Sequence, residues 1–150
     1  MEVPKCYMCD GPGTTKEHVP PKCLFPEKKD VGGRDFKKKL ITVPSCVTHN
    51  ASKTNNDEFL MVCLAGIINN NIVGRNHFQT KVDRALTRKE KDFLNKQIIR
   101  NLQHKTIKTK GNKYTLVAVG RPNYDRLITC FESIGYGLFF HEFQSLWHTS

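Results

Sequence analysis

The chain has 150 residues, a length that suits one domain with a real hydrophobic core but not two. Apolar residues make up 38% of it and charged residues 25%, which excludes a low-complexity or disordered polymer. Lysine and arginine number 24 against 14 aspartates and glutamates, so the formal net charge is +10. A field of that sign attracts polyanions, and nucleic acid is the first partner to consider, although a basic chain can also be merely soluble.

The expected location is the cytoplasm. The N-terminal residues contain no apolar signal core, and the longest apolar run, Phe59 to Ile68, is too short to span a bilayer. With no export signal, the six cysteines are better explained by metal binding and free thiols than by disulfides.

The first part of the chain reads as a hairpin with a long loop. Residues 1–13 are expected to form a short strand or turn, closed by a Gly- and Pro-rich turn signal. β-favouring residues predict a strand over 14–19, which two prolines end because neither can donate to a sheet ladder. Residues 22–39 have the prolines, glycines and lysines of an irregular basic loop, and a second strand is predicted over 40–43.

The remainder is expected to be mainly helical. A helix from Asn50 to about Asn69, or two short ones, has a polar start and a body that is apolar on all sides and therefore buried. Thr87 and Glu90 form a capping box for a helix to about His104. A strand is predicted over 113–119, and helical spacing of apolar residues predicts a last helix from Asn123 to about Phe143.

Two short pairs of metal-type ligands flank the predicted hairpin. Cys6 and Cys9 form a Cys-x2-Cys pair, and Cys46 and His49 form a Cys-x2-His pair. A gap of two residues lets both side chains of a pair turn toward one point, and four such ligands suit one tetrahedral zinc ion. We predict a closed, structural zinc site; the alternative is two free ligand pairs in loops.

Glu17 and His18 lie between these pairs, and Asn50 directly follows the second. A histidine such as His18 can take a proton near neutral pH, and the oxygens of Glu17 and Asn50 suit one hard divalent cation, Mg²⁺ or Mn²⁺. Taken alone, His18 is equally a surface or fold-stabilising histidine, and Asn50 is equally a helix N-cap.

The order of these motifs resembles the HNH (His-Me finger, ββα-metal) endonuclease family. The similarity covers residues 6–59: a Cys-x2-Cys pair, a strand with an acid–His dipeptide, a basic loop, and Val43-Pro44-Ser45-Cys46 followed by Asn50 and a helix. It implies an α+β fold in a single domain over 1–150. The zinc-stapled ββα-metal core would occupy about 6–70, and a mainly helical or α+β extension about 71–150.

The resemblance also implies an activity, namely metal-dependent hydrolysis of DNA, with RNA as a lesser variant. His18 takes the position of the general base, and Glu17 and Asn50 take those of the ligands of the catalytic ion. Glu17 stands where aspartate is more usual, and His49 stands where the fourth zinc ligand is usually cysteine. The middle asparagine of the family name is not evident.

The expected partner is double-stranded DNA, and the oligomeric state is left open, a homodimer included. Sequence-independent contacts to phosphate are expected from Lys22, Lys37, Lys38, Lys39 and Lys53. A solvated basic loop would carry most of the same lysines. The competing hypothesis is a catalytically inactive zinc module that binds nucleic acid or a protein. Such a module has no need of Glu17, His18 and Asn50 together, so these residues favour the enzyme.

Overall fold

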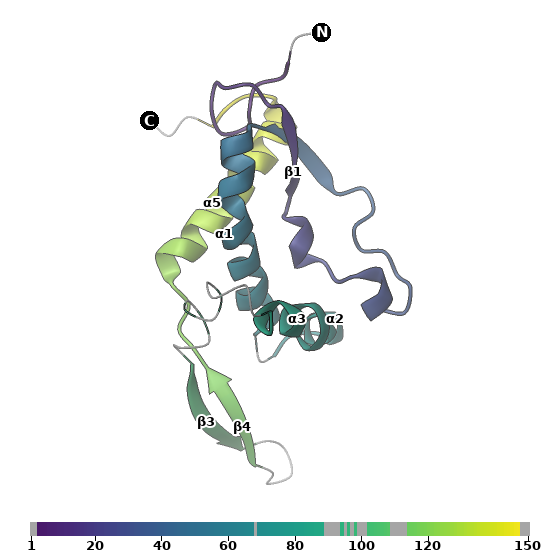
Figure 1. The fold of residues 1–150 in the computed structure, drawn as a ribbon, viewed down its shortest axis with the longest axis vertical. Helices are drawn as coiled ribbons and strands as arrows, with labels where there is room; N and C mark the ends of the chain where they lie inside the picture. The colour runs from purple at the N-terminus through teal and green to yellow at the C-terminus, as the bar shows by residue number, and fades with distance from the viewer. Residues whose placement is uncertain are drawn as a thin grey trace.

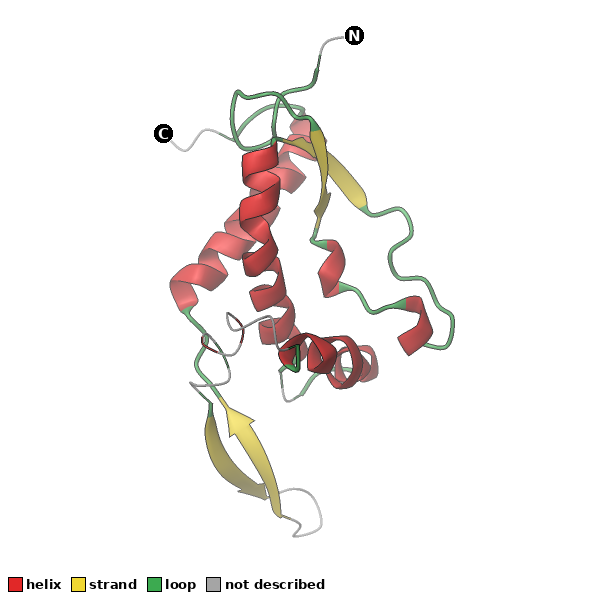
Figure 2. Ribbon diagram, in the orientation of Figure 1, coloured by secondary structure: helices red, strands yellow, loops and turns green. Residues whose placement is uncertain are grey.

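The computed structural model describes residues 3–67, 69–88, 94, 96, 98, 102–108 and 114–147. In these residues helices are combined with two separate two-stranded antiparallel sheets (Figures 1 and 2). The elements are β1 (Thr15–Val19), β2 (Ile41–Ser45), α1 (Val47–Ala65), α2 (Ile72–His77), α3 (Asp83–Leu86), β3 (Gln103–Lys108), β4 (Tyr114–Val119) and α5 (Tyr124–Phe143). Helix α1 runs through the middle, with the β1–β2 hairpin and α5 beside one end and α2 and α3 at the other (Figure 1).

The β1–β2 hairpin confirms both strands predicted in the first part of the chain. Thr15 pairs with Ser45 and Val19 with Ile41, so β2 ends two residues later than predicted and contains Pro44. A proline is tolerated there because a sheet of two strands has only edge strands. The long loop between the strands holds two 3-10 turns, Lys22–Leu24 and Lys28–Asp30.

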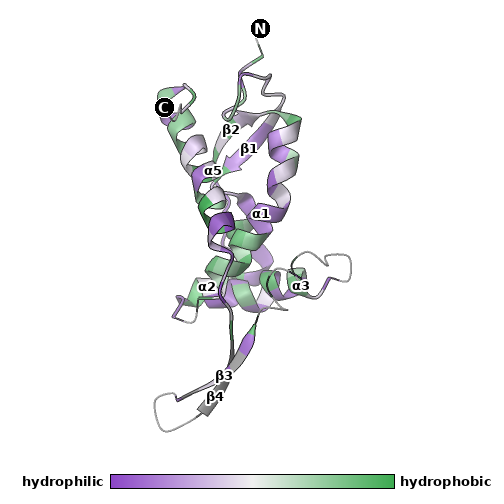
Figure 3. Ribbon diagram, turned by 90° about the vertical axis from the view of Figure 1, so that its left-hand side faces the viewer, coloured by the Kyte–Doolittle hydropathy of each residue, from purple (hydrophilic) through white to green (hydrophobic). Residues whose placement is uncertain are grey.

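Helix α1 begins at Val47 and ends at Ala65, so the predicted start at Asn50 was three residues late. The cap is a cysteine sulfur: Cys46 Sγ accepts a hydrogen bond from the backbone nitrogen of His49 at 3.4 Å. The predicted burial of the second half is confirmed, because Phe59 to Val62 are at most 4% exposed. Figure 3 shows the same division, with hydrophobic green confined mainly to the later turns of α1.

The chain between α1 and α5 differs most from the prediction. Helices α2 and α3, joined by a π-helical segment over Phe78–Val82, were not predicted. Thr87 follows the end of α3 and its hydroxyl donates to Asp83 O at 2.9 Å, so it terminates a helix there. Glu90, the other half of the expected capping box, lies outside the described residues.

The predicted helix to His104 was also too long, because β3 begins at Gln103. Its partner β4 confirms the strand expected over 113–119. Together the two strands put a β-hairpin into an extension that had been expected to be mainly helical.

Helix α5 is confirmed, with Asn123 as its cap: the side-chain oxygen accepts from Arg126 N at 3.0 Å. One part of α5 packs through Cys130 on Phe59 and Leu60 of α1. Another part closes a second core around the hairpin and the first ligand pair, made of Cys6, Tyr7, Val19, Val43 and Phe140. The C-terminal helix therefore helps to hold the region in which the candidate site lies.

Gly137 is where α5 approaches the hairpin most closely, and we expect Gly137→Ala to destabilise the fold. A Cβ atom there would lie 2.5 Å from Cγ2 of Val19, which is fully buried. The clash should cost about 1–3 kcal/mol, whereas Gly135→Ala, with nothing within 4 Å of its Cβ, should gain about 0.5–1 kcal/mol from helix propensity. Urea unfolding of both variants in dilute solution measures the difference; equal stabilities would contradict this packing.

Candidate metal centre and adjoining polar site

The four predicted zinc ligands come together in one cluster. The ligand atoms of Cys6, Cys9, Cys46 and His49 all lie within 4.8 Å of one another. His49 Nδ1 is 3.3 Å from Cys46 Sγ and 3.4 Å from Cys6 Sγ. A nitrogen about 2.0 Å and a sulfur about 2.3 Å from one tetrahedral ion would be roughly 3.5 Å apart. The cluster can therefore hold a metal ion such as zinc.

Backbone contacts bring the two ligand pairs to the same place. The first pair lies in a turn whose Tyr7 nitrogen donates to Pro44 O of β2 at 2.9 Å. The second pair follows β2 directly, with Cys46 as the N-cap of α1 and His49 in its first turn. An ion bound there would connect the start of the chain, the end of β2 and the start of α1.

The thiols of the cluster differ in their tendency to ionise. Burial alone would raise the pKa of Cys6, but hydrogen bonds from Met8 N and from other groups of the cluster outweigh it and lower the pKa to about 6. The pKa of Cys9 is raised: a backbone hydrogen bond from Gly11 lowers it, but desolvation and the neighbouring Cys6 sulfur together prevail. Cys6 is thus the first of the pair to become the thiolate that binds metal.

Two polar contacts next to the cluster join β1 to α1. Asn50 Nδ2 donates to Thr15 Oγ1 at 3.1 Å, and Lys53 Nζ lies 3.5 Å from Glu17 Oε1. Residues two apart on a strand share a face and are separated by about 6.6 Å. The structure therefore places Glu17 and Asn50, both predicted site residues, at one interface.

Lys53 requires a correction, because it had been expected to contact phosphate from the basic surface. It is only 5% exposed and Glu17 only 6%, so the two form a buried ion pair. Lys53 Nζ also lies 5.7 Å from the ring centroid of Tyr7, within cation–π range. The lysine therefore belongs to the β1–α1 interface.

A second carboxylate adds negative charge to this interface. Burial raises the pKa of Asp57 to about 6; the charge of Lys53 opposes the shift, and that of Glu17 adds to it. The pKa of Tyr7 is raised as well, first by burial and then by the charges of Glu17 and Asp57. The region around Lys53 thus has an excess of acidic groups over basic ones.

His18 follows Glu17 on β1, and it is half-buried. The strand predicted to carry both residues is confirmed. Successive side chains of a strand point to opposite faces of the sheet, so His18 and Glu17 project to different sides of the hairpin. The two residues can meet a common ligand only at the edge of β1.

The remaining predicted phosphate contacts divide into two groups. Lys22, Lys38 and Lys39 are exposed. Lys37 is held by Glu27, with Nζ 2.5 Å from Oε1, and Lys81 shares the same oxygen at 3.1 Å. These two ammonium groups lower the pKa of Glu27 to about 2, so Lys37 already has a counter-ion.

Lys53 and Asp57 were not predicted as neighbours of Glu17. Their signal was their spacing: Asn50, Lys53 and Asp57 recur at three and four residues and so share one face of a helix. Because Lys53 had been expected to contact phosphate, this common face was not recognised.

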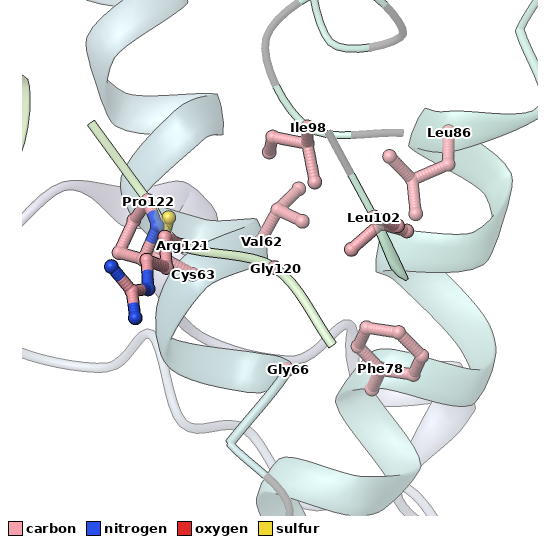
Figure 4. A pocket seen from close by; sticks show the side chains of 10 residues that line it. All are labelled: Val62, Cys63, Gly66, Phe78, Leu86, Ile98, Leu102, Gly120, Arg121 and Pro122. Atoms are coloured by element: carbon pink, nitrogen blue, oxygen red, sulfur yellow. The ribbon is translucent and has the colours of Figure 1, made fainter. Parts of the chain in front are cut away.

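An apolar cavity of about 190 Å³ lies away from this site, by the later turns of α1 (Figure 4). Phe78, Leu86, Ile98 and Leu102 converge on it, and Arg121 lies at its edge beside Cys63.

None of the helices in the described part of the chain has the length and apolarity needed to cross a membrane.

Comparison of the chain with models of protein families, with curated proteins and with solved structures finds no match. Function is therefore inferred from the residues of the site.

Proposed function

We propose that the protein is a metal-dependent endonuclease of the HNH type that hydrolyses DNA. In this proposal the Cys3His cluster binds a structural zinc that holds the parts of a ββα-metal core together. His18 is the general base, and Glu17 and Asn50 hold one Mg²⁺ or Mn²⁺. The observation that carries it is the placement of Glu17 and Asn50 at one β1–α1 interface, directly beside a cluster fit for zinc.

The chemistry of the interface suits a hard cation. Asn50 uses its amide nitrogen on Thr15, which leaves its amide oxygen to coordinate an ion. The carboxylate of Glu17 already lies beside a positive charge, the ammonium of Lys53. Glu17 and Asn50 would hold a divalent ion in place of that ammonium, because carboxylate and amide oxygens are ligands that Mg²⁺ prefers.

His18 reaches the same phosphate from the other side of the strand. Adjacent Cα atoms are about 3.8 Å apart. Within the described part of the chain β1 has a free edge, because its sheet has two strands. A phosphate at that edge would lie within reach of both side chains, Glu17 on one face and His18 on the other. His18 would take a proton from the water that attacks phosphorus, and a divalent ion held by Glu17 and Asn50 would supply charge stabilisation for the departing 3′ oxygen. The family resemblance implies products with 5′-phosphate and 3′-hydroxyl ends.

The second candidate function is a zinc module without catalysis that binds nucleic acid or a protein. The buried Lys53–Glu17 pair favours it, because a lysine that neutralises the carboxylate permanently leaves no site for a divalent ion.

Nicking of a supercoiled plasmid with Mg²⁺, Mn²⁺ or EDTA separates the two functions. We expect the wild type to nick the plasmid with either ion and not with EDTA. We expect His18→Ala to nick it at least about 100-fold more slowly, because that is the usual contribution of a general base. His141→Ala, which changes an exposed histidine of α5, is the matched control and should keep full activity. Equal cleavage by His18→Ala would show that His18 is not the general base. A wild type that cleaves neither DNA nor RNA with either ion would leave the non-catalytic zinc module as the remaining candidate function.

A further inference from the structure

Helix α5 has a second apolar face that the described residues leave uncovered. Cys130, Ser133, Gly137 and Phe140 point into the molecule and are buried. On the opposite side lies a stripe of residues spaced alternately four and three apart, defined by Tyr124, Ile128, Phe131, Gly135 and Leu138. This is the a/d spacing by which one helix packs along another.

The large apolar side chains of the stripe are strongly exposed to solvent. Tyr124 is 65% exposed, Ile128 55%, Phe131 51% and Leu138 42%. Helix α5 lies toward the viewer in Figure 3, where several of its turns are coloured as hydrophobic. Single exposed apolar residues need no explanation, but a continuous row of them indicates a surface that a partner covers.

Further apolar side chains lie at the C-terminal end of α5, beyond the stripe. The rings of Phe139 and Phe143 are 4.6 Å apart, and those of Phe139 and Trp147 are 5.0 Å apart. Phe143 is 63% exposed and Trp147 52%. The four large side chains of the stripe itself are each about half exposed. Since a large side chain buries about 150–250 Å² when fully covered, the stripe offers roughly 400 Å² of apolar surface. Two such surfaces give roughly 800 Å², the size of a weak interface that dissociates on dilution.

The pattern of the stripe is complementary to itself. Phe131 is its centre, because Tyr124 and Leu138 each lie seven residues away (131 − 124 = 138 − 131 = 7). Ile128, a large side chain, lies on one side of the centre, and Gly135 lies at nearly the same distance on the other. An added Cβ at Gly135 would meet nothing within 4 Å, so the glycine leaves a shallow gap in the row.

We propose that this stripe packs against the same stripe of a second copy of the chain, with the two α5 helices antiparallel about a two-fold axis at Phe131. In that arrangement Ile128 of each copy fills the gap at Gly135 of the other, and Tyr124 lies against Leu138. A two-fold dimer uses the same surface twice, which is the condition that a self-complementary row meets. The dimer does not depend on the nuclease proposal, since none of its residues belongs to the metal centre or to the β1–α1 interface.

Sedimentation equilibrium of the intact chain tests the dimer. The wild type should be dimeric at about 100 µM and dissociate on dilution. Phe131→Glu should be monomeric at the same concentration, because it buries two charges at the axis. Ile72→Glu is the matched control, since Ile72 is an equally apolar side chain, 64% exposed, on α2, and its variant should dimerise as the wild type does.

A size exchange within the stripe tests the antiparallel arrangement itself. Gly135→Leu should weaken dimerisation by about ten- to a hundredfold, because it overfills the gap that Ile128 occupies. Ile128→Ala combined with Gly135→Leu should recover most of that loss, because the large and small residues have only changed places. A wild type that remains monomeric at about 100 µM would overturn the proposal. A dimer unaffected by Phe131→Glu, or a double variant no better than Gly135→Leu, would do so as well.

Discussion

Cys46→Ser should leave the chain unfolded or insoluble, and the purified wild type should contain about one zinc per chain by elemental analysis. Cys46 is both a ligand of the cluster and the N-cap of α1, so its loss affects the metal and the helix together. Binding of structural zinc contributes about 10–16 kcal/mol in small zinc-binding units. A domain of this size has a total stability of only about 5–15 kcal/mol. Losing the ion therefore removes more free energy than the rest of the fold can supply.

Cys63→Ser is the matched control for this prediction. Cys63 is half-buried on α1 and lies outside the cluster, and burial raises the pKa of its thiol to about 11, which keeps it protonated. Replacing it should cost at most about 1–3 kcal/mol, the cost of an imperfectly satisfied hydroxyl, and should leave the zinc content unchanged. Far-UV circular dichroism with and without a chelator measures both variants. A wild type that is folded and free of zinc would refute the structural role of the ion.

Several elements were predictable because their signals are local. The β-favouring residues before Pro20, the two ligand pairs and the apolar spacing after Asn123 each identify an element without knowledge of its neighbours. The start of α1 was missed because its cap is the sulfur of Cys46 rather than an oxygen. Strand β3 was missed because Gln103–Lys108 is mostly polar, and only its pairing with β4 defines it.

The polar site shows a different limit. The sequence predicted that Glu17 and Asn50 would approach each other, because a metal-closed loop requires it. It did not predict that Lys53 would take the place beside Glu17, since a lysine on a basic chain is ordinarily expected in solvent. That pairing depends on how α1 is rotated against β1, which is a property of the tertiary packing and not of the residues around Lys53.

The Lys53–Glu17 pair predicts a large and non-additive effect on stability. Lys53→Met should destabilise the fold by about 3–5 kcal/mol, because it leaves the buried carboxylate of Glu17 without a counter-charge. Glu17→Gln should lower the stability by a similar amount, because it leaves the ammonium of Lys53 without a counter-charge. The double variant should be much less destabilised than the sum, since replacing both members of a buried pair is often neutral. Urea unfolding of the four proteins measures this cycle.

The exposed pair of Lys5 and Asp10 provides the control. Its atoms are closer, at 2.9 Å, but both side chains are more than two-thirds exposed, so Lys5→Met should change stability by less than about 1 kcal/mol. If Lys53→Met were equally harmless, the carboxylate of Glu17 would have to be solvated or protonated, and the interface described above would be wrong. The folded double variant also separates the two candidate functions. It keeps the zinc cluster and the shape of the interface but has no carboxylate for a divalent ion, so a nuclease must lose its cleavage while a binding module keeps its partner.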